Sequence, residues 1–249
     1  MDLLRYGFAN QYIVNNGSVL NNTGTFLIVL AISLCLVCGY LLGSLNFAIL
    51  ISKKLGKDDV RNHGSKNAGT TNMLRIYGKK AALMTFVGDF LKAIVACLIG
   101  RLCFGFEGAY IAGLFCVIGH VFPIFFKFKG GKGVATTAGV MLACDLPSFL
   151  IILLLYCGVF ALSNYVSLAS IMSGLMYPFI LYSVNSMLPE EMRTTGICIL
   201  ASFAIGVIVV AKHAGNIKRL LEGKESKTYL SKKKKEQVQV KKSLHSDDQ

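Results

Sequence analysis

The sequence predicts an all-α, polytopic integral membrane protein with about seven transmembrane helices, its N-terminus outside and its C-terminus in the cytoplasm. Hydrophobic residues make up 54% of the 249 residues and charged residues only 16%, whereas soluble domains carry about 25% charged residues. Several apolar runs approach the roughly 20 residues that a helix needs to cross the core of a bilayer. These runs do not alternate with polar residues as barrel strands would, so helices are expected.

Each apolar run is assigned to one helix, in chain order. The fourth run is too short to cross the core as a straight helix, so it is tilted, continuous with the glycine-rich segment before it, or only partly inserted. The helix count therefore lies between five and seven, and we take seven. The expected spans are residues 26–50, 81–100, 108–126, 133–144, 146–163, 166–184 and 195–211.

Composition divides the chain into three parts. Residues 1–25 are a polar, Asn-rich segment, residues 26–225 form one membrane-embedded domain, and residues 226–249 form a Lys-rich tail. The tail has no apolar periodicity, so we expect it to be disordered and to touch anionic lipid headgroups.

The positive charges indicate the orientation. The net charge is +13, and 22 of the 26 Lys and Arg residues lie in segments that are cytoplasmic when the N-terminus is outside. This is the positive-inside pattern of membrane proteins. A nucleic-acid-binding protein would also be basic, but it would not bury so much of its length in hydrocarbon. The eight cysteines lie in or beside apolar runs, which favours packing over a disulfide framework.

The most informative loop is residues 58–75, where Arg61 and Arg75 flank many small and hydrogen-bonding residues. Glycine lets successive backbone N–H groups face one anion, hydroxyls add donors, and Arg offers a fork for phosphate. A plain connector needs only two or three such residues, so anion binding is the better interpretation. The loop includes Gly64, Ser65, Asn67, Gly69, Thr70, Thr71 and Asn72.

A second glycine-rich segment extends from Gly119 to Thr136 and is centred on Lys132. It is not a nucleotide-binding P-loop, because Gly133 stands where a magnesium-binding Ser or Thr would be. The glycines around Lys132 could bring backbone donors and the ammonium to one phosphate. Equally, Lys132 could be an interfacial lysine beside glycines that pack helices.

Two further polar clusters lie at the expected cytoplasmic ends of spans. Ser167 and Ser170 share a helix face and, taken alone, favour helix packing. His213 and Asn216 project together just after the last span, either as an anion-binding or proton-moving pair or as part of a basic helix end.

Asp89 and Lys92 lie inside the second span, where charges are costly. They either neutralise each other and anchor helices, or they contact the site. Because the other polar clusters all fall on the cytoplasmic side, we expect one pocket there that handles phosphate.

Three motifs in this order resemble those of the bacterial acyl-phosphate:glycerol-3-phosphate acyltransferases. The first extends from Gly64 to Arg75, the second from Gly119 through Gly-Gly-Lys-Gly to Thr136, and the third from His213 to Glu225. The resemblance covers about residues 38–225, and three motifs in order make it specific.

The resemblance implies a seven-helix enzyme of the bacterial inner membrane with its active site on the cytoplasmic face. It would move an acyl group from acyl-phosphate to the 1-hydroxyl of glycerol 3-phosphate, giving lysophosphatidic acid and phosphate in the first step of phospholipid synthesis. Carried over by position, Ser65, Arg75, His213 and Asn216 are candidate catalytic residues, and Glu225 looks structural. The candidate substrate-binding residues are Gly64, Asn67, Gly69, Thr71, Asn72, Gly130, Gly131, Lys132, Gly133 and Ser167.

No cofactor or metal is implied, because acyl-phosphate is already activated. The implied partners are acyl-phosphate, glycerol 3-phosphate and membrane lipid, with no nucleic acid, and docking of a soluble acyl-phosphate synthase stays open. One alternative is a transporter of a small phosphorylated anion, which would need polar groups along a whole crossing path. Another is a magnesium-dependent lipid phosphotransferase, for which Asp58 and Asp59 are the only close carboxylate pair beside the glycine-rich loops.

Two positions depart from the family pattern. Lys66 stands where the family usually has Gly, and Thr70 where it usually has Ala. A Cβ at position 66 would alter the glycine-lined turn, although the added ammonium would still suit phosphate.

Overall fold

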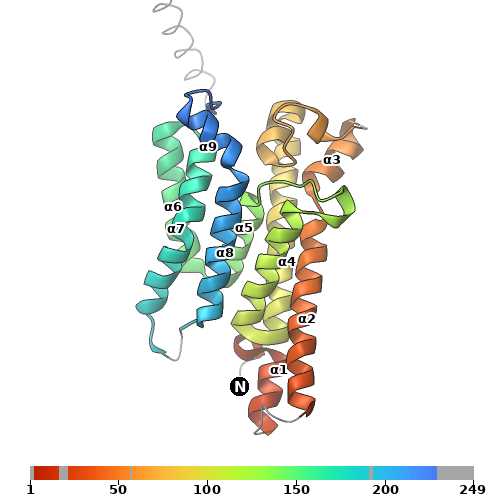
Figure 1. The fold of residues 1–249 in the computed structure, drawn as a ribbon, viewed down its shortest axis with the longest axis vertical. Helices are drawn as coiled ribbons and strands as arrows, with labels where there is room; N and C mark the ends of the chain where they lie inside the picture. The colour runs from red at the N-terminus through yellow and green to blue at the C-terminus, as the bar shows by residue number, and fades with distance from the viewer. Residues whose placement is uncertain (1–2, 17–21, 57, 191–192, 229–249) are drawn as a thin grey trace, which may run out of the picture.

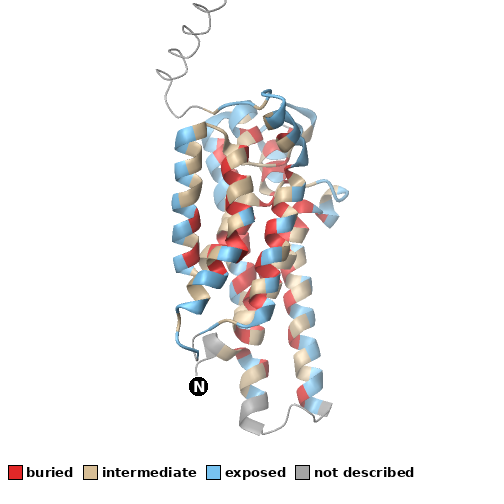
Figure 2. Ribbon diagram, turned by 60° about the vertical axis from the view of Figure 1, so that its left-hand side comes forward, coloured by how far each residue is buried: buried red, intermediate tan, exposed pale blue. Residues whose placement is uncertain are grey.

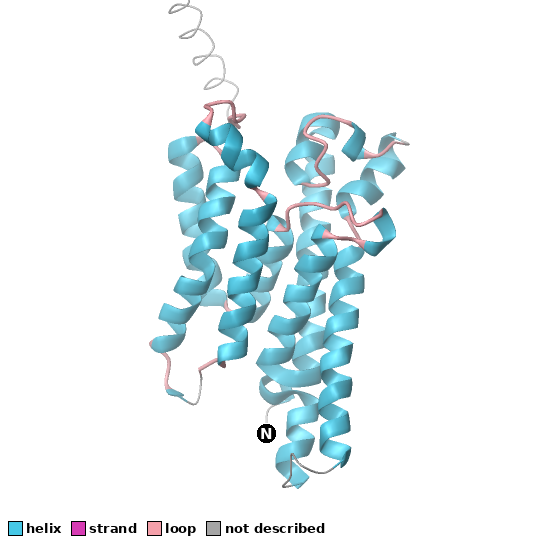
Figure 3. Cartoon of the chain, viewed as in Figure 1, coloured by secondary structure: helices cyan, strands magenta, loops and turns pink. Residues whose placement is uncertain are grey.

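The computed structural model describes residues 3–16, 22–56, 58–190 and 193–228, and every regular element in these ranges is a helix (Figure 3). Most of the Lys-rich tail expected at 226–249 lies outside the described residues. The helices are α1 (Leu3–Asn16), α2 (Asn22–Ser44), α3 (Phe47–Gly56), α4 (Thr70–Val121), α5 (Val134–Cys144), α6 (Leu146–Ser163), α7 (Val166–Ser186), α8 (Gly196–Lys212) and α9 (Ala214–Leu221), with short 3-10 turns η1 (Val60–Asn62) and η2 (Ile124–Phe126).

The long helices run side by side in two groups (Figure 1). Helices α6, α7 and α8 form one group, α2 and α4 form the other, and α5 packs against both α4 and α6. Within the described ranges, four helices are long and apolar enough to cross a membrane, or five if α8 and α9, bent by 54°, count as one broken span. The chain is therefore a multi-pass membrane protein.

The expected spans at 81–100 and 108–126 both fall in α4, which folds back on itself. Phe104 (φ −141°) and Gly105 (φ 65°) leave the helical conformation. A Cβ on Gly100 would lie 2.1 Å from the carbonyl oxygen of Gly108. Helix α4 is thus a hairpin of two antiparallel arms, as the two expected spans require. The second arm ends at Val121 rather than at 126, because the proline at 123 cannot continue a helix.

The expected span 26–50 is helical as far as Ser44 but is interrupted near its end, because the helix breaks at Leu45 and Asn46 and α3 begins at Phe47. The break exposes backbone oxygens, and the ammonium of Lys92 occupies those of Gly43 (2.9 Å) and Leu45 (2.7 Å). Lys92 also pairs with Asp89 at 2.8 Å, with both side chains buried. The two charges therefore satisfy a broken helix inside the membrane, where unpaired backbone groups would be costly.

The polar segment expected at 1–25 contains helix α1, which is interrupted at Gly7 (φ 69°). Here α1 meets the turn of the α4 hairpin, since a Cβ on Gly7 would lie 2.4 Å from the backbone nitrogen of Gly105. Helix α1 is therefore packed onto the domain.

Small residues let α2 approach the second arm of α4 closely. A Cβ on Gly39 would lie 2.4 Å from the carbonyl oxygen of Ala112, and one on Gly43 would lie 2.1 Å from that of Cys116. Lipid tails are as apolar as these side chains, so close van der Waals packing of this kind, and not the hydrophobic effect, holds helices together inside a membrane. Buried residues face the helix contacts, whereas the outward face of α6 is exposed (Figure 2), with Leu162 89% accessible. Lipid is expected to cover such a face.

Candidate active site

A cavity of about 820 Å³ lies between the two helix groups. Its walls come from α4, α5, α6 and α7, from the loop before α4, and from the junction of α8 with α9. Twelve of the fourteen site residues expected from the sequence line it. They are Gly64, Ser65, Asn67, Gly69, Thr71, Asn72, Arg75, Lys132, Gly133, Ser167, His213 and Asn216.

The other two expected residues, Gly130 and Gly131, have a different position from the one we expected. Their N–H groups donate to the carbonyls of Val121 and His120, both at 3.2 Å. A Cβ on Gly131 would lie 2.3 Å from Nε2 of His120. These glycines let the loop pack against the end of α4, and a contact of theirs with substrate stays a prediction.

The loop before α4 is held in shape by the buried side chain of Asn72. Its amide nitrogen donates to the carbonyls of Val60 (3.1 Å), His63 (3.0 Å) and Asn67 (3.1 Å). Its amide oxygen accepts from the N–H of Ser65 at 3.0 Å. Asn72 therefore fixes where Ser65 stands at the cavity, and its own polar groups are fully occupied.

Lys132 is joined to the third motif by a chain of hydrogen bonds. Its ammonium donates to the amide oxygen of Asn216, whose amide nitrogen donates to Glu225 Oε1 at 2.6 Å. Ser167 Oγ donates to the same carboxylate oxygen at 2.8 Å, and Arg219 Nε donates to Oε2 at 2.7 Å. Glu225 thus connects α7, α9 and, through Asn216, the loop before α5.

The charges of this cluster are perturbed by their surroundings. Burial lowers the pKa of Lys132 to about 8, an effect that Glu225 opposes and that Arg219 and Arg75 reinforce. Burial raises the pKa of Glu225, but hydrogen bonds from Asn216, Ser167 and Arg219 outweigh it, so the pKa lies below its usual value. Arg75 and Lys132, from different motifs, therefore line the same cavity and are close enough for their charges to interact.

His213 is buried at the bend between α8 and α9 and lines the cavity. Its Nδ1 lies 2.7 Å from the carbonyl oxygen of Val209, which can only accept, so Nδ1 carries the proton. In the neutral ring, Nε2 is then the accepting nitrogen. A histidine fixed in this way can take a proton from a hydroxyl or receive a hydrogen bond from one.

Three helices begin at the polar end of the cavity. Gly69 and Thr70 mark the start of α4, Gly133 that of α5, and Gly215 lies in the first turn of α9. Unpaired N–H groups and the helix dipole make each start favourable for an anion. Gly133 has a φ of 84°, which lets the chain turn into α5 directly after Lys132.

Lys66 is an exposed cation at the rim of this end and has a φ of 57°. This left-handed conformation favours glycine, which gives a physical reason for the family preference at that position. The added side chain is tolerated because it faces open space.

The far end of the cavity, away from the three motifs, is mostly apolar, although Asp89 also lines the cavity on α4 between Phe86 and Phe90. No pattern in the sequence indicated these apolar residues. A cavity wall of large side chains cannot be told from lipid-facing or core residues by hydropathy alone. Its apolar residues include Phe86, Phe90, Met141, Phe149, Ile152 and Leu153. Glu225 was also absent from the expected site, although its place in the third motif was a usable signal.

The two carboxylates that a magnesium-dependent enzyme would need are engaged elsewhere. Asp58 lies 2.5 Å from His63, and Asp59 pairs with Arg61 at 2.6 Å. Across the described part of the chain, no group of three or more His, Cys, Asp or Glu side chains could hold a metal ion.

Comparison with known proteins identifies the family. The family model for glycerol-3-phosphate acyltransferase matches residues 33–223. A glycerol-3-phosphate acyltransferase of Finegoldia magna is 42% identical over 205 residues, covering 81% of this chain and 96% of that protein. One from Thermoanaerobacter pseudethanolicus is 41% identical over 191 residues, covering 77% of this chain and 92% of that protein.

Solved structures agree with these relatives. The crystal structure of PlsY, an integral membrane glycerol 3-phosphate acyltransferase, in its glycerol 3-phosphate form has a TM-score of 0.72 and 37% identity, covering 80% of this chain and 96% of that one. The lysophosphatidic acid form gives 0.70 and 36% identity, covering 80% and 95%. The alternative of an anion transporter finds no support in these comparisons. The three motifs, the shared cavity and these matches together show that the chain belongs to the glycerol-3-phosphate acyltransferase family of membrane enzymes.

Proposed function

We propose that this membrane-embedded glycerol-3-phosphate acyltransferase takes its acyl group from acyl-phosphate and transfers it directly to the 1-hydroxyl of glycerol 3-phosphate. The observation that carries the proposal is a single cavity with a cationic end and an apolar end. Arg75, Lys132 and three helix starts lie at the first end, and aromatic and aliphatic side chains line the second. An acyl-phosphate has the same two-part chemistry.

In the proposed function, the cationic end holds the phosphates of both substrates. Arg75 and Lys132 supply full charges, and the starts of α4, α5 and α9 supply N–H groups. Ser65, held by Asn72, adds a hydroxyl at the same wall. Holding both substrates in one orientation accounts for much of the acceleration in a transfer between two bound molecules.

In the proposed step, the glycerol hydroxyl oxygen attacks the acyl carbonyl carbon, and the bond from that carbon to the phosphate oxygen breaks. The electron pair leaves with inorganic phosphate, whose charge Lys132 and Arg75 stabilise. The hydroxyl proton passes to His213 Nε2 or to a phosphate oxygen of the substrate. If His213 is the acceptor, His213→Ala abolishes the pH dependence of kcat; if phosphate is, the dependence survives at a lower rate.

The apolar end is proposed to hold the acyl chain. Phe86, Phe90, Phe149 and Ile152 line it on α4 and α6, and an acyl chain gains free energy by leaving water for such a surface. Lysophosphatidic acid would then leave with its chain already among apolar side chains that adjoin the lipid.

We propose seven membrane crossings, with the N-terminus outside and the polar end of the cavity in the cytoplasm of a bacterial inner membrane. The two arms of α4 count separately in this topology, and α5 is the short crossing. The excess of Lys and Arg in the segments around the cationic end supports the orientation. The proposed catalytic domain is residues 26–225, followed by the tail.

The test is acyl transfer by the purified protein, with acyl-phosphate and acyl-CoA offered in parallel. Arg75→Ala and Lys132→Ala are expected to lower kcat/KM for acyl-phosphate roughly hundredfold, the usual cost of one lost transition-state contact. Lys79→Ala, on α4 outside the cavity, is the matched control and should stay within twofold of the unmodified protein. Transfer from acyl-CoA alone would overturn the donor assignment, and full activity of both cavity variants would overturn the site.

A further inference from the structure

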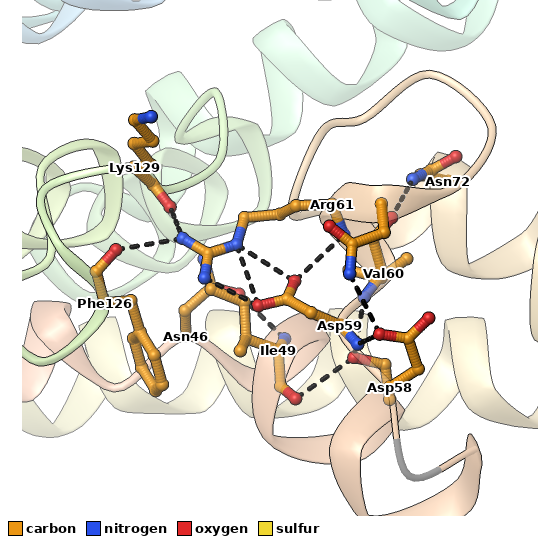
Figure 4. A network of polar contacts seen from close by, with 11 residues as sticks. Asn46, Ile49, Asp58, Asp59, Val60, Arg61, Asn72, Phe126 and Lys129 are labelled. Carbon is orange, nitrogen blue, oxygen red and sulfur yellow. Dashed lines mark hydrogen bonds and ion pairs between the residues drawn. The ribbon is translucent and has the colours of Figure 1, made fainter.

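The guanidinium of Arg61 joins two loops that are far apart in the sequence (Figure 4). Arg61 lies in the loop between α3 and α4, in turn η1. Its Nη1 donates to the carbonyl oxygens of Phe126 at 2.9 Å and Lys129 at 2.7 Å, both in the loop between α4 and α5. The sequence suggested a phosphate-binding fork at Arg61, but the fork is filled by protein oxygens.

Asp59 holds the other side of the same guanidinium. Its two carboxylate oxygens accept from Nε and Nη2 of Arg61 at 2.9 and 2.6 Å. Asp59 also accepts from the N–H of Arg61, which starts turn η1. Hydrogen bonding to Arg61 lowers the pKa of Asp59, so the carboxylate stays charged. A planar guanidinium that is bonded to a carboxylate on one side and to two carbonyl oxygens on the other has little freedom to move.

Neither Asp59 nor Arg61 lines the cavity, yet each loop that Arg61 joins leads directly to it. On one side, Val60 is held by Asn72, which fixes Ser65. On the other side, Lys129 is three residues before Lys132. Between those two lysines the chain is bonded to the end of α4 through the N–H groups of Gly130 and Gly131.

We propose that Asp59 and Arg61 are positioning residues that set the spacing between the two phosphate-binding walls of the active site, and that they act through Lys132. The inference rests on the proposed function of those walls. Without the fork, the first loop still folds around Asn72, and the contacts that remain between the two loops in the described part of the chain are packing contacts, of Phe126 on the cluster that contains Val60 and Ala68 and of Gly131 against the carbonyl of Ala68. We expect such contacts to fix the spacing of the loops less tightly than the guanidinium does. A shift of about 1 Å at a group that orients a substrate can cost about a hundredfold in rate.

The first test measures kcat, KM for each substrate and Tm for Arg61→Ala and Arg61→Lys. Arg61→Ala is expected to lower kcat/KM for glycerol 3-phosphate at least tenfold, with KM rising and kcat falling. Arg61→Lys is expected to restore little, because an ammonium cannot bridge a carboxylate and two carbonyls in one plane. Asp58→Asn is the matched control, since the hydrogen bonds of Asp58, with the N–H of Asp59, His63 and Asn62, stay within its own loop, and an Asn side-chain oxygen can still accept from the N–H of Asp59.

The second test is a double-mutant cycle with Lys132. If Arg61 acts by placing Lys132, Arg61→Ala should cost less than twofold once Lys132→Ala is present, because the group being placed is gone. Binding of radiolabelled glycerol 3-phosphate gives the same comparison where turnover is too slow. Additive losses in the cycle would overturn the inference, as would unchanged kinetics in a folded Arg61→Ala protein.

A variant that fails to fold does not end the test. Asp59→Asn keeps the size of the side chain and leaves both Arg61–carbonyl bonds possible, so an intermediate loss of kcat/KM is expected from it, and unchanged kinetics would contradict the inference. If the unmodified protein transfers no acyl group from acyl-phosphate, the proposed donor fails, whereas the glycerol 3-phosphate binding cycle still decides the role of Arg61.

Discussion

Lys66 carries backbone strain at the rim of the cationic end. A left-handed conformation costs an L-residue about 1 kcal/mol relative to glycine, and Lys66 has a φ of 57°. Lys66→Gly is therefore expected to raise the free energy of unfolding by about 1 kcal/mol, read as an increase in Tm in detergent.

The control at this position separates strain from charge. Lys66→Ala keeps the Cβ and the strain but removes the ammonium, so its Tm should stay close to that of the unmodified protein. An equal gain from Lys66→Ala would mean that charge repulsion, and not the backbone, destabilises the loop.

Lys132 gives the site a predicted pH dependence. Its pKa of about 8 means that the ammonium is present below this pH and is lost as the pH rises through it. A phosphate dianion binds the ammonium better than the neutral amine, so KM for glycerol 3-phosphate should rise above about pH 8. Lys132→Arg stays charged throughout and should flatten that rise, whatever its effect on kcat.

The residue types in the motifs indicated phosphate chemistry by themselves, but the task of each residue could not be assigned from its type and spacing. Asn67, Asn72 and Asn216 are all polar members of a motif, yet the side-chain amide of Asn72 donates its hydrogen bonds to backbone carbonyls of its own loop. Gly130 and Gly131 allow the loop before α5 to pack against the end of α4. Sequence spacing brings a side chain to the right loop and does not tell which way it points.

At the scale of elements, the α4 hairpin depends on glycines where its arms touch. Gly100→Ala places a Cβ 2.1 Å from the carbonyl oxygen of Gly108, so the arms must separate. We expect a loss of about 1–3 kcal/mol in the free energy of unfolding, the usual cost of overpacking. Thermal unfolding in detergent measures it.

Gly158 on α6 is the matched control for this substitution. A Cβ there would meet nothing within 4 Å, so Gly158→Ala should stabilise the helix slightly through its better helix propensity. A destabilisation as large as that of Gly100→Ala would show that the effect is not specific to the hairpin.

Helix α6 could be placed from the sequence to the residue, whereas the break between α2 and α3 could not. The proline near the start of this apolar run and the Asn after its end are local signals that mark where the helix begins and ends. The break at Leu45 and Asn46 depends on Lys92, which is 47 residues further along the chain. A feature stabilised by a distant side chain leaves no local signal.

For the whole molecule, the orientation is open to direct labelling. In a variant whose eight native cysteines are replaced by serine or alanine, single cysteines introduced at Lys66 and at Glu190 replace exposed residues at opposite ends of the bundle in the proposed topology. A membrane-impermeant thiol reagent added outside intact cells should label the cysteine at 190 and spare the one at 66 until the membrane is opened. The reverse result would invert the topology and move the cationic end outside.

The gathering of three remote motifs around one cavity is the part of the site that the sequence anticipated best, because charge and glycine content marked each segment. The apolar end of the cavity had no comparable signal in the sequence. It exists only because α4, α5, α6 and α7 leave space between them, and that space depends on side-chain packing across helices.

The N–H groups at the three helix starts that line the cavity differ from the nearby lysines in how they respond to pH. Peptide groups cannot lose a proton, so the attraction that α4, α5 and α9 exert on an anion is the same in acid and in alkali. In the proposed reaction, this attraction acts on released phosphate as well as on incoming substrate, so we expect inorganic phosphate to leave by exchange with the next anion and not through a change in the charge of these peptide groups.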